Sequence, residues 1–320
     1  MGNFSIKTVC LIVPVYNEED SISKFIAEVS AIIESITPKI NYSIVFINDG
    51  SSDRTLARVY EHAQLNRKIS AINLSRNFGK EAALYAGLCN AKGDAFIPID
   101  VDLQDPPHLI SEMIERWQCG AKIVNARRIN RDSDSWLKRQ SARAFYRVFN
   151  ILSDRAIPSD VGDFRLLDRE VVQVICQMGE RSRFNKALFS WVGFDTEEVT
   201  FERPKRSAGQ SAWSYWKLWK LSLDGIFSSS TAPLRFWTYF GAIIGVLMML
   251  YSLFLLVRTL IFGIDVPGYA STVILIMTFG SLNLFALGII GEYVGRIYTE
   301  VRQRPVYIIS STYNLNQDEQ

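Results

Sequence analysis

Three acidic residues, Asp100, Asp102 and Asp105, lie within six residues of one another, directly after the apolar segment 95–99. A buried strand that ends in an Asp-x-Asp pair presents two carboxylates at one place. One of them can bind a hard divalent cation while the other meets the hydroxyl groups of a sugar. Mg²⁺ and Mn²⁺ favour oxygen ligands and bridge them to substrate phosphates. The spacing therefore predicts that Asp100 and Asp102 face a metal ion and a diphosphate.

Polar, turn-prone clusters also follow the three preceding strands that the sequence predicts: VPVYNEED, NDGSSDRT and NLSRNFGKE. Taken singly, each cluster is explained by turns and helix caps; Ser52 or Asp53, for example, is suited to capping the next helix. Ligands of open parallel sheets bind at the carboxyl ends of the strands. Four such clusters in succession therefore indicate a polar ligand at one rim of the sheet.

Short apolar segments rich in β-branched residues alternate with helical patterns over the first part of the chain. Strands are predicted at 8–13, 43–47, 69–74, 95–99 and 122–126, and helices at 19–35, 53–66, 79–91 and 107–119. This alternation predicts an α/β, Rossmann-like domain with a mainly parallel sheet covered on both faces.

Several other classes of site are excluded by the motifs that the sequence lacks. It contains no GxxxxGK[ST] loop, no GxGxxG after the first strand and no HExxH, and it has only 2 histidines. The net charge of +2 gives no broad field for nucleic acid. The 4 cysteines, at positions 10, 89, 119 and 176, lack metal-ligand spacing. Reduced thiols in the cytosol are therefore expected for residues 1–233.

Composition changes near Pro233, where two long uncharged stretches begin, at about 236–257 and 268–291. Each is long enough to cross a bilayer core of about 30 Å as a helix. A buried hairpin in a soluble protein is the simpler alternative. Arg235 precedes the first stretch, and Arg296, Arg302 and Arg304 follow the second. This distribution predicts a multi-pass protein of the inner (plasma) membrane with both chain ends in the cytoplasm.

Two further segments have the amphipathic pattern of helices that lie on a membrane surface. Arg139, Arg143 and Arg147 recur at helical spacing within 135–152, and Trp216 and Trp219 share one face of 211–227. A solvated charged face and core packing, respectively, are the simpler alternatives. The domains are predicted as a catalytic domain at 1–210, an interface helix at 211–233 and a two-helix membrane region with a cytoplasmic tail at 234–320.

Seven motifs carry a resemblance to a known family: VPVYNEED, NDGSSD, SRNFGKEAAL, DVDLQDPP, GDFRLLDR, RFNKALFSWVGF and GEYVGRIY. Over nearly its whole length the chain resembles the polyisoprenyl-phosphate glycosyltransferases. These are inverting GT-A enzymes of glycosyltransferase family 2, and the bactoprenol glucosyltransferases among them look most similar. One departure is Val101, where the family often has alanine. The larger side chain is expected to adjust nucleotide packing without removing metal binding.

The resemblance implies roles for individual residues. Asp102 and Asp100 match the metal ligands, and Asp163 matches the acid proposed as catalytic base. Arg128 matches a catalytic basic residue near both phosphates. The nucleotide-sugar donor is expected to contact Pro14, Tyr16, Glu18, Asp49, Asp100, Val101 and Gln104. The acceptor phosphate is expected to meet a set of basic residues: Arg128, Lys138, Arg139, Arg165, Lys205 and Arg206. Lys205 and Arg206 lie in the loop 203–211, which is a candidate lid.

The expected reaction is inverting transfer of glucose from UDP-glucose to undecaprenyl phosphate, with Mg²⁺ or Mn²⁺, by a membrane-bound homo-tetramer that serves O-antigen or cell-envelope glycosylation. Mannose, galactose or an amino sugar are alternative donors. A processive polysaccharide synthase is disfavoured because no QxxRW motif occurs. A catalytically inactive nucleotide-sugar-binding scaffold is disfavoured by the intact set of Asp100, Asp102 and Asp163.

Charge also predicts how Asp163 acts. A phosphate monoester has a second pKa near 6, so the acceptor is already largely ionised at neutral pH. It has little need of a strong base. Asp163 is therefore expected to matter more by position and charge than by removing a proton; a helix-proximal cap is the simpler alternative.

Overall fold

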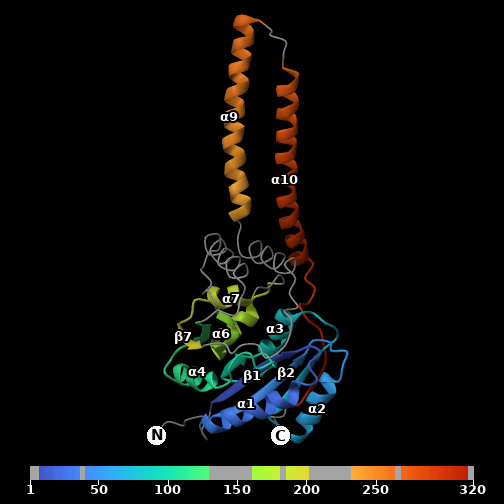
Figure 1. Cartoon of the computed structure of the whole chain (residues 1–320), viewed down its shortest axis with the longest axis vertical. Coiled ribbons are helices and arrows are strands. Elements are labelled where there is room, and N and C mark those ends of the chain that lie inside the picture. The colour runs from blue at the N-terminus through green and yellow to red at the C-terminus, as the bar shows by residue number, and fades with distance from the viewer. Residues whose placement is uncertain are drawn as a thin grey trace.

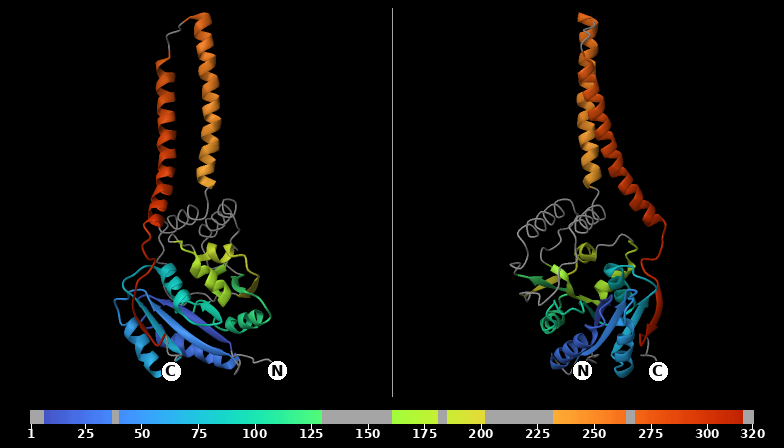
Figure 2. Two further views of the ribbon diagram at one scale, coloured as in Figure 1. Left: turned by 180° about the vertical axis from the view of Figure 1, so that it is seen from behind. Right: turned by 45° about the vertical axis from the view of Figure 1, so that its right-hand side comes forward.

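The computed structural model describes residues 7–36, 40–129, 161–180, 185–201, 232–263 and 268–315. Within this part of the chain, an α/β body carries two long helices that project from one of its ends (Figures 1 and 2). The C-terminal segment returns from the second long helix to the α/β body.

An eight-stranded sheet forms the centre of the body, in the order β7-β5-β6-β4-β1-β2-β3-β8. Its strands are β1 (Thr8–Val15), β2 (Asn41–Asn48), β3 (Ile69–Leu74), β4 (Ala95–Pro98), β5 (Ile123–Arg128), β6 (Val161–Asp168), β7 (Thr196–Phe201) and β8 (Ile309–Tyr313). Strands β1 to β4 run parallel to their neighbours among themselves, and β5 runs parallel to β7. In contrast, β6 is antiparallel to β4 and β5, and β8 is antiparallel to β3.

Helices cover both faces of this sheet. Because successive residues of a strand point to opposite faces, each strand contributes side chains to the core on both sides. Val9, Leu11 and Val13 of β1 join the core beneath the helices on one face, which are α1 (Ile22–Ile36), α2 (Thr55–Leu65) and α4 (Leu109–Gln118). Cys10 and Ile12 join the core beneath those on the other face, which are α3 (Lys80–Asn90), α6 (Arg169–Gln177) and α7 (Asn185–Trp191).

The strands and helices predicted within residues 8–126 are confirmed, with ends that shift by a few residues. Strands β6, β7 and β8 were not predicted, and the antiparallel pairs make the sheet more mixed than expected. The segments 135–152, 203–211 and 211–227 lie outside the described residues, with their basic residues Lys138, Arg139, Lys205 and Arg206.

Both long apolar stretches are helical, as α9 (Ala232–Phe262) and α10 (Tyr269–Val301). Large apolar side chains project from both into the surroundings, among them Phe236, Leu250, Leu284 and Ile297. Leu275–Val301 is the single helical segment, among the described residues, that is long and apolar enough to cross a membrane; a shorter apolar stretch spans Phe236–Met248. Two membrane crossings therefore remain a prediction.

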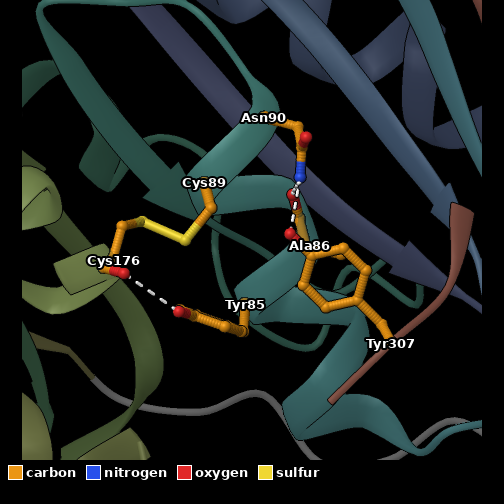
Figure 3. Close-up of a disulfide and its surroundings, with 6 residues drawn as sticks. All are labelled: Tyr85, Ala86, Cys89, Asn90, Cys176 and Tyr307. Carbon is orange, nitrogen blue, oxygen red and sulfur yellow. Dashed lines mark hydrogen bonds between the residues drawn. A yellow bond between two sulfur atoms is a disulfide. The ribbon is translucent and has the colours of Figure 1, made fainter. Parts of the chain in front are cut away.

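The expected reduced state of all four cysteines is wrong for two of them. Cys89 of α3 and Cys176 of α6 form a disulfide, with their Cα atoms 5.6 Å apart (Figure 3). The two residues are 87 positions apart in the sequence. Only the packing of α3 beside α6 brings them together, so their spacing along the chain did not reveal the pair. Cys10 and Cys119 are free thiols.

The chain that leaves α10 is fastened to the α/β body. Strand β8 pairs with β3 and forms an edge of the sheet. Just after β8, the side-chain amide of Asn314 donates to the carbonyl groups of Ala63 and Ile69, at 2.8 and 3.3 Å. Before β8, the Tyr307 hydroxyl accepts a hydrogen bond from the amide of Asn90 in α3 (Figure 3). The segment beyond α10 is thus part of the same sheet as the N-terminal strands.

We expect Asn314→Ala to destabilise this attachment. Asn314 adopts a left-handed backbone conformation with φ 56°, which asparagine tolerates better than alanine. Alanine would lose the two hydrogen bonds and add backbone strain, together about 2 kcal/mol. The full-length protein in detergent should then melt several degrees lower, and the amides of β3 should exchange hydrogen faster.

Asn314→Gly is the matched variant. Glycine loses the same hydrogen bonds but accepts a positive φ, so its melting temperature should fall between those of the wild type and Asn314→Ala. Unchanged melting and unchanged exchange in both variants would contradict a stable pairing of β8 with the sheet.

Candidate functional site

A pocket of about 290 Å³ opens at the carboxyl ends of β1, β2 and β4. It is lined by Pro14, Val15, Tyr16, Glu18, Asp49, Asn77, Gly79, Lys80, Ala83, Asp100, Val101 and Asp102. Seven of the residues predicted to bind donor or metal therefore come together: Pro14, Tyr16, Glu18, Asp49, Asp100, Val101 and Asp102. The other five, Val15, Asn77, Gly79, Lys80 and Ala83, were given no role from the sequence.

Asp49, at the end of β2, holds the loop that leads into α3. One carboxylate oxygen accepts the backbone N–H of Phe78 at 2.7 Å, and the other accepts that of Gly79 at 2.9 Å. Burial raises the pKa of the Asp49 carboxyl, against the opposing effect of these two N–H groups and Arg76. The next residue, Gly50, has φ 70° and lies so close to the backbone of Arg76 and Asn77 that a Cβ would clash. The Asp-Gly pair thus fixes where α3 begins.

Local turn chemistry explains part of the polar clusters that follow β1 and β2. One carboxylate oxygen of Asp53 accepts both the N–H and the hydroxyl of Thr55, at 3.0 and 2.6 Å, and so closes the turn before α2. The N-cap residue of α2 is Arg54, without a side-chain cap, so the prediction that Ser52 or Asp53 caps this helix is wrong. The Thr55 hydroxyl oxygen in turn accepts the N–H of Glu18 at 2.8 Å. Glu18 is therefore held at the pocket by its backbone.

The Asp-x-Asp pair leaves β4 on a tight turn. An oxygen of Asp102 accepts the N–H of Gln104 at 3.1 Å, and Leu103 between them has φ 55°. Val101 points inward and is 4% exposed, whereas Asp102 is exposed. The turn therefore buries the apolar residue of the motif and presents the Asp102 carboxylate at the pocket.

Lys80, the first residue of α3, lies between two carboxylates from different strands. Its Nζ is 2.8 Å from each oxygen of Asp100 and 2.9 Å from Oδ2 of Asp163 in β6. Burial on its own would lower the pKa of the Lys80 ammonium, but Asp163 and Asp100 together raise it. Lys80 therefore stays charged at neutral pH and connects Asp163 to the pocket.

Three other predicted site residues that the structure describes, Arg165, Arg128 and Gln104, do not line the pocket. Arg165 is 3% exposed; its guanidinium donates to the carbonyl oxygen of Gly162 at 2.7 Å and stacks 4.4 Å from the ring centre of Phe189. This placement supports the local structure of β6 and does not favour direct contact with a lipid phosphate. Arg128 ends β5, and Gln104 follows the turn at Asp102; neither is among the residues that line the pocket.

The residues at this rim fit a divalent cation that shares its ligands with a substrate. The residues lining the pocket include four acids, Glu18, Asp49, Asp100 and Asp102, against the single positive charge of Lys80. A diphosphate would be repelled there unless a cation came with it. No group of three or more His, Cys, Asp or Glu side chains suited to a metal exists among the described residues. A metal would therefore take one or two carboxylates and complete its shell with phosphate oxygens and water, as Mg²⁺ commonly does.

A mainly parallel α/β sheet with polar groups gathered at the carboxyl ends of its strands is a Rossmann-like arrangement, and it fits a GT-A type enzyme. Residues 10–176 match the domain described as glycosyl transferase family 2. The chain belongs to this family and is a glycosyltransferase.

Relatives extend the similarity beyond the catalytic domain. A bactoprenol glucosyl transferase of Shigella phage SfV is 46% identical, over 95% of this chain and 98% of its own. The prophage bactoprenol glucosyl transferase homolog of Escherichia coli (strain K12) is 45% identical, over 94% and 98%. An uncharacterised glycosyltransferase of Synechocystis is 49% identical, over 95% of both chains. The resemblance to bactoprenol glucosyltransferases noted in the sequence is confirmed by this similarity.

Proposed function

We propose that the protein transfers glucose from UDP-glucose to undecaprenyl phosphate with inversion at the anomeric carbon. An oxygen of the lipid phosphate forms a bond to C1 of the sugar, while the bond from C1 to the β-phosphate oxygen breaks and its electron pair leaves with UDP. The product is a polyprenyl-phosphate sugar, suited to O-antigen or cell-envelope glycosylation. Relatives named as bactoprenol glucosyl transferases over nearly the full chain support this choice of substrates.

One observation carries the proposal. Lys80 contacts both Asp100, just after β4, and Asp163 of β6, beside a pocket of a suitable size for part of a nucleotide sugar. The donor would lie along the rim formed by Pro14, Tyr16, Glu18 and Asp49. When bound, Mg²⁺ or Mn²⁺ would neutralise the diphosphate and stabilise the leaving UDP. Asp102 would be the main ligand of this ion, and Asp100 the second.

The acceptor phosphate would be oriented by residues of the chain itself. Asp163 lies on the β6 side of Lys80 and has a 21% exposed side chain. It would position the acceptor phosphate indirectly, by holding the Lys80 ammonium that attracts it, and a largely ionised phosphate needs little help in losing a proton. Arg128, at the end of β5, is proposed to meet the acceptor or donor phosphates.

We further propose that α9 and α10 both cross the inner membrane, with the catalytic domain in the cytoplasm. Their exposed apolar side chains suit lipid. Arg235 in the first turn of α9, Arg296 near the end of α10, and Arg302 and Arg304 beyond it suit the cytoplasmic side. Because β8 pairs with β3, the tail and the catalytic domain share one side of the membrane. The domain limits 1–210, 211–233 and 234–320, and a homo-tetramer, are parts of this proposal.

The proposed function is tested with the purified full-length protein, undecaprenyl phosphate and Mn²⁺. UDP-glucose, UDP-galactose, GDP-mannose and UDP-N-acetylglucosamine are supplied separately, and the lipid is analysed by mass spectrometry. We expect one added hexose with UDP-glucose, and no product when undecaprenol without a phosphate replaces the acceptor. A product only with another donor would contradict glucose, and a polymeric product would contradict the reaction.

A further inference from the structure

Lys80 is well placed to control entry of the cation into this site. Resting on the proposed function, we propose that Lys80 is an internal counter-ion of the donor site. Its ammonium holds Asp100 and Asp163 together in the absence of a divalent cation, releases Asp100 when the cation binds, and remains with Asp163. Lys80 is thereby a positioning residue for both carboxylates.

The geometry of the ion pairs carries this proposal. The ammonium touches both oxygens of Asp100 and one oxygen of Asp163, all at 2.8 to 2.9 Å. A cation bound by Asp100 would have to use one or both of the oxygens that Lys80 contacts. The side chain of Asp100 is 37% exposed and that of Asp163 only 21%, so the Asp100 half of the bridge is the more accessible to an incoming ion.

The position of Lys80 in its helix is a second, independent observation. As the first residue of α3, it places a positive charge at the end of the helix where the backbone dipole is already positive, which is unfavourable for a lysine. Asp49 fixes the backbone immediately before it through the N–H groups of Phe78 and Gly79. The backbone is thus held in place, while the four-carbon side chain leaves the ammonium free to move between partners.

Lys80→Met separates this role from a structural one. Without the ammonium, Asp100 and Asp163 keep their negative charges and lose their competitor, so Mn²⁺ alone should bind about tenfold more tightly. The affinity is measured from the electron paramagnetic resonance signal of free Mn²⁺, on the full-length protein without donor or acceptor. At saturating Mn²⁺ and UDP-glucose, kcat should fall, because Asp163 is no longer held. A purely structural defect would weaken metal binding together with turnover.

Two further variants complete the experiment. Lys80→Gln keeps a hydrogen-bond donor between the carboxylates. It should show the same gain in Mn²⁺ affinity, and it replaces Lys80→Met if that variant does not fold. Lys92→Met removes an exposed lysine just beyond the other end of α3, so it matches the change in net charge and should leave Mn²⁺ affinity unaltered.

Unchanged or weaker Mn²⁺ binding in both Lys80 variants would overturn the inference. So would the absence of Mn²⁺ binding in every variant; glucosyl transfer in the presence of EDTA would then show whether the proposed function survives without a metal. Conversely, tighter Mn²⁺ binding by the Lys80 variants, together with a wild type that transfers no glucose, would support the role of Lys80 and reject the proposed donor.

Discussion

Asp102→Asn is expected to reduce glucosyl transfer by about 100-fold or more, the scale on which a preorganised group that stabilises developing charge contributes. The asparagine oxygen can still accept the N–H of Gln104, so the turn after β4 should persist. What is lost is the negative charge of the exposed carboxylate at the pocket, on which the proposed metal depends. The measurement is the rate with undecaprenyl phosphate and UDP-glucose over a series of Mn²⁺ concentrations, and excess Mn²⁺ should restore it poorly.

Asp195→Asn makes the same chemical change at an exposed residue before β7 and should leave the rate close to that of the wild type. The wild type should also lose its activity in EDTA and regain it when Mn²⁺ or Mg²⁺ is added. Near-normal transfer by EDTA-treated protein would reject the metal assignment for Asp102, whatever the variant does.

The regular part of the fold was predictable because its signals are local. Strands β1 to β5 are short apolar segments between helical patterns, and a strand or helix is determined largely by such periodicity. Strand β6 was missed because its residues include Asp163 and Arg165, which were interpreted as functional groups. Strand β8, with the sequence ISSTY, was missed because it is polar and follows the apolar helices. Its place beside β3 depends on tertiary pairing across more than two hundred residues.

Only those site residues that directly follow a predicted strand could be predicted from the sequence. Asp100 and Asp102 follow β4 directly, and the topology of a parallel sheet brings them to the ends of β1 and β2. Lys80 was missed because a lysine at the start of a helix resembles any surface residue until β6 is placed beside β4. One signal was available: a cation at the amino end of α3 opposes the helix dipole, and such a position calls for dedicated anionic partners. The disulfide between Cys89 and Cys176 left no comparable signal.

Asp163 offers the second large effect, because its two proposed roles predict different pH profiles. If it were the base, Asp163→Asn would lose its rate mainly at low pH, where the acceptor phosphate still carries a proton, and would regain it as the pH rises and the phosphate loses that proton without help. The structure pairs this carboxylate with Lys80 at 2.9 Å, which suits an oriented anion. Asparagine keeps the size of the side chain and its hydrogen-bonding capacity while removing its charge.

We therefore expect Asp163→Asn to lose about 10- to 100-fold in kcat/KM for the lipid phosphate, by a similar factor at every pH from about 5.5 to about 8.5. Over this range the acceptor phosphate changes from mainly singly to mainly doubly ionised, so its own nucleophilicity increases without help from the protein. The wild type should show the same acid limb, because that limb belongs to the substrate. Binding of UDP-glucose, measured separately on the variant, should remain close to that of the wild type. A variant that binds the donor normally, loses most of its rate near pH 5.5 and regains nearly wild-type transfer by about pH 8.5 would identify Asp163 as the base and reject the positioning role, because only the singly ionised acceptor carries a proton for a base to remove.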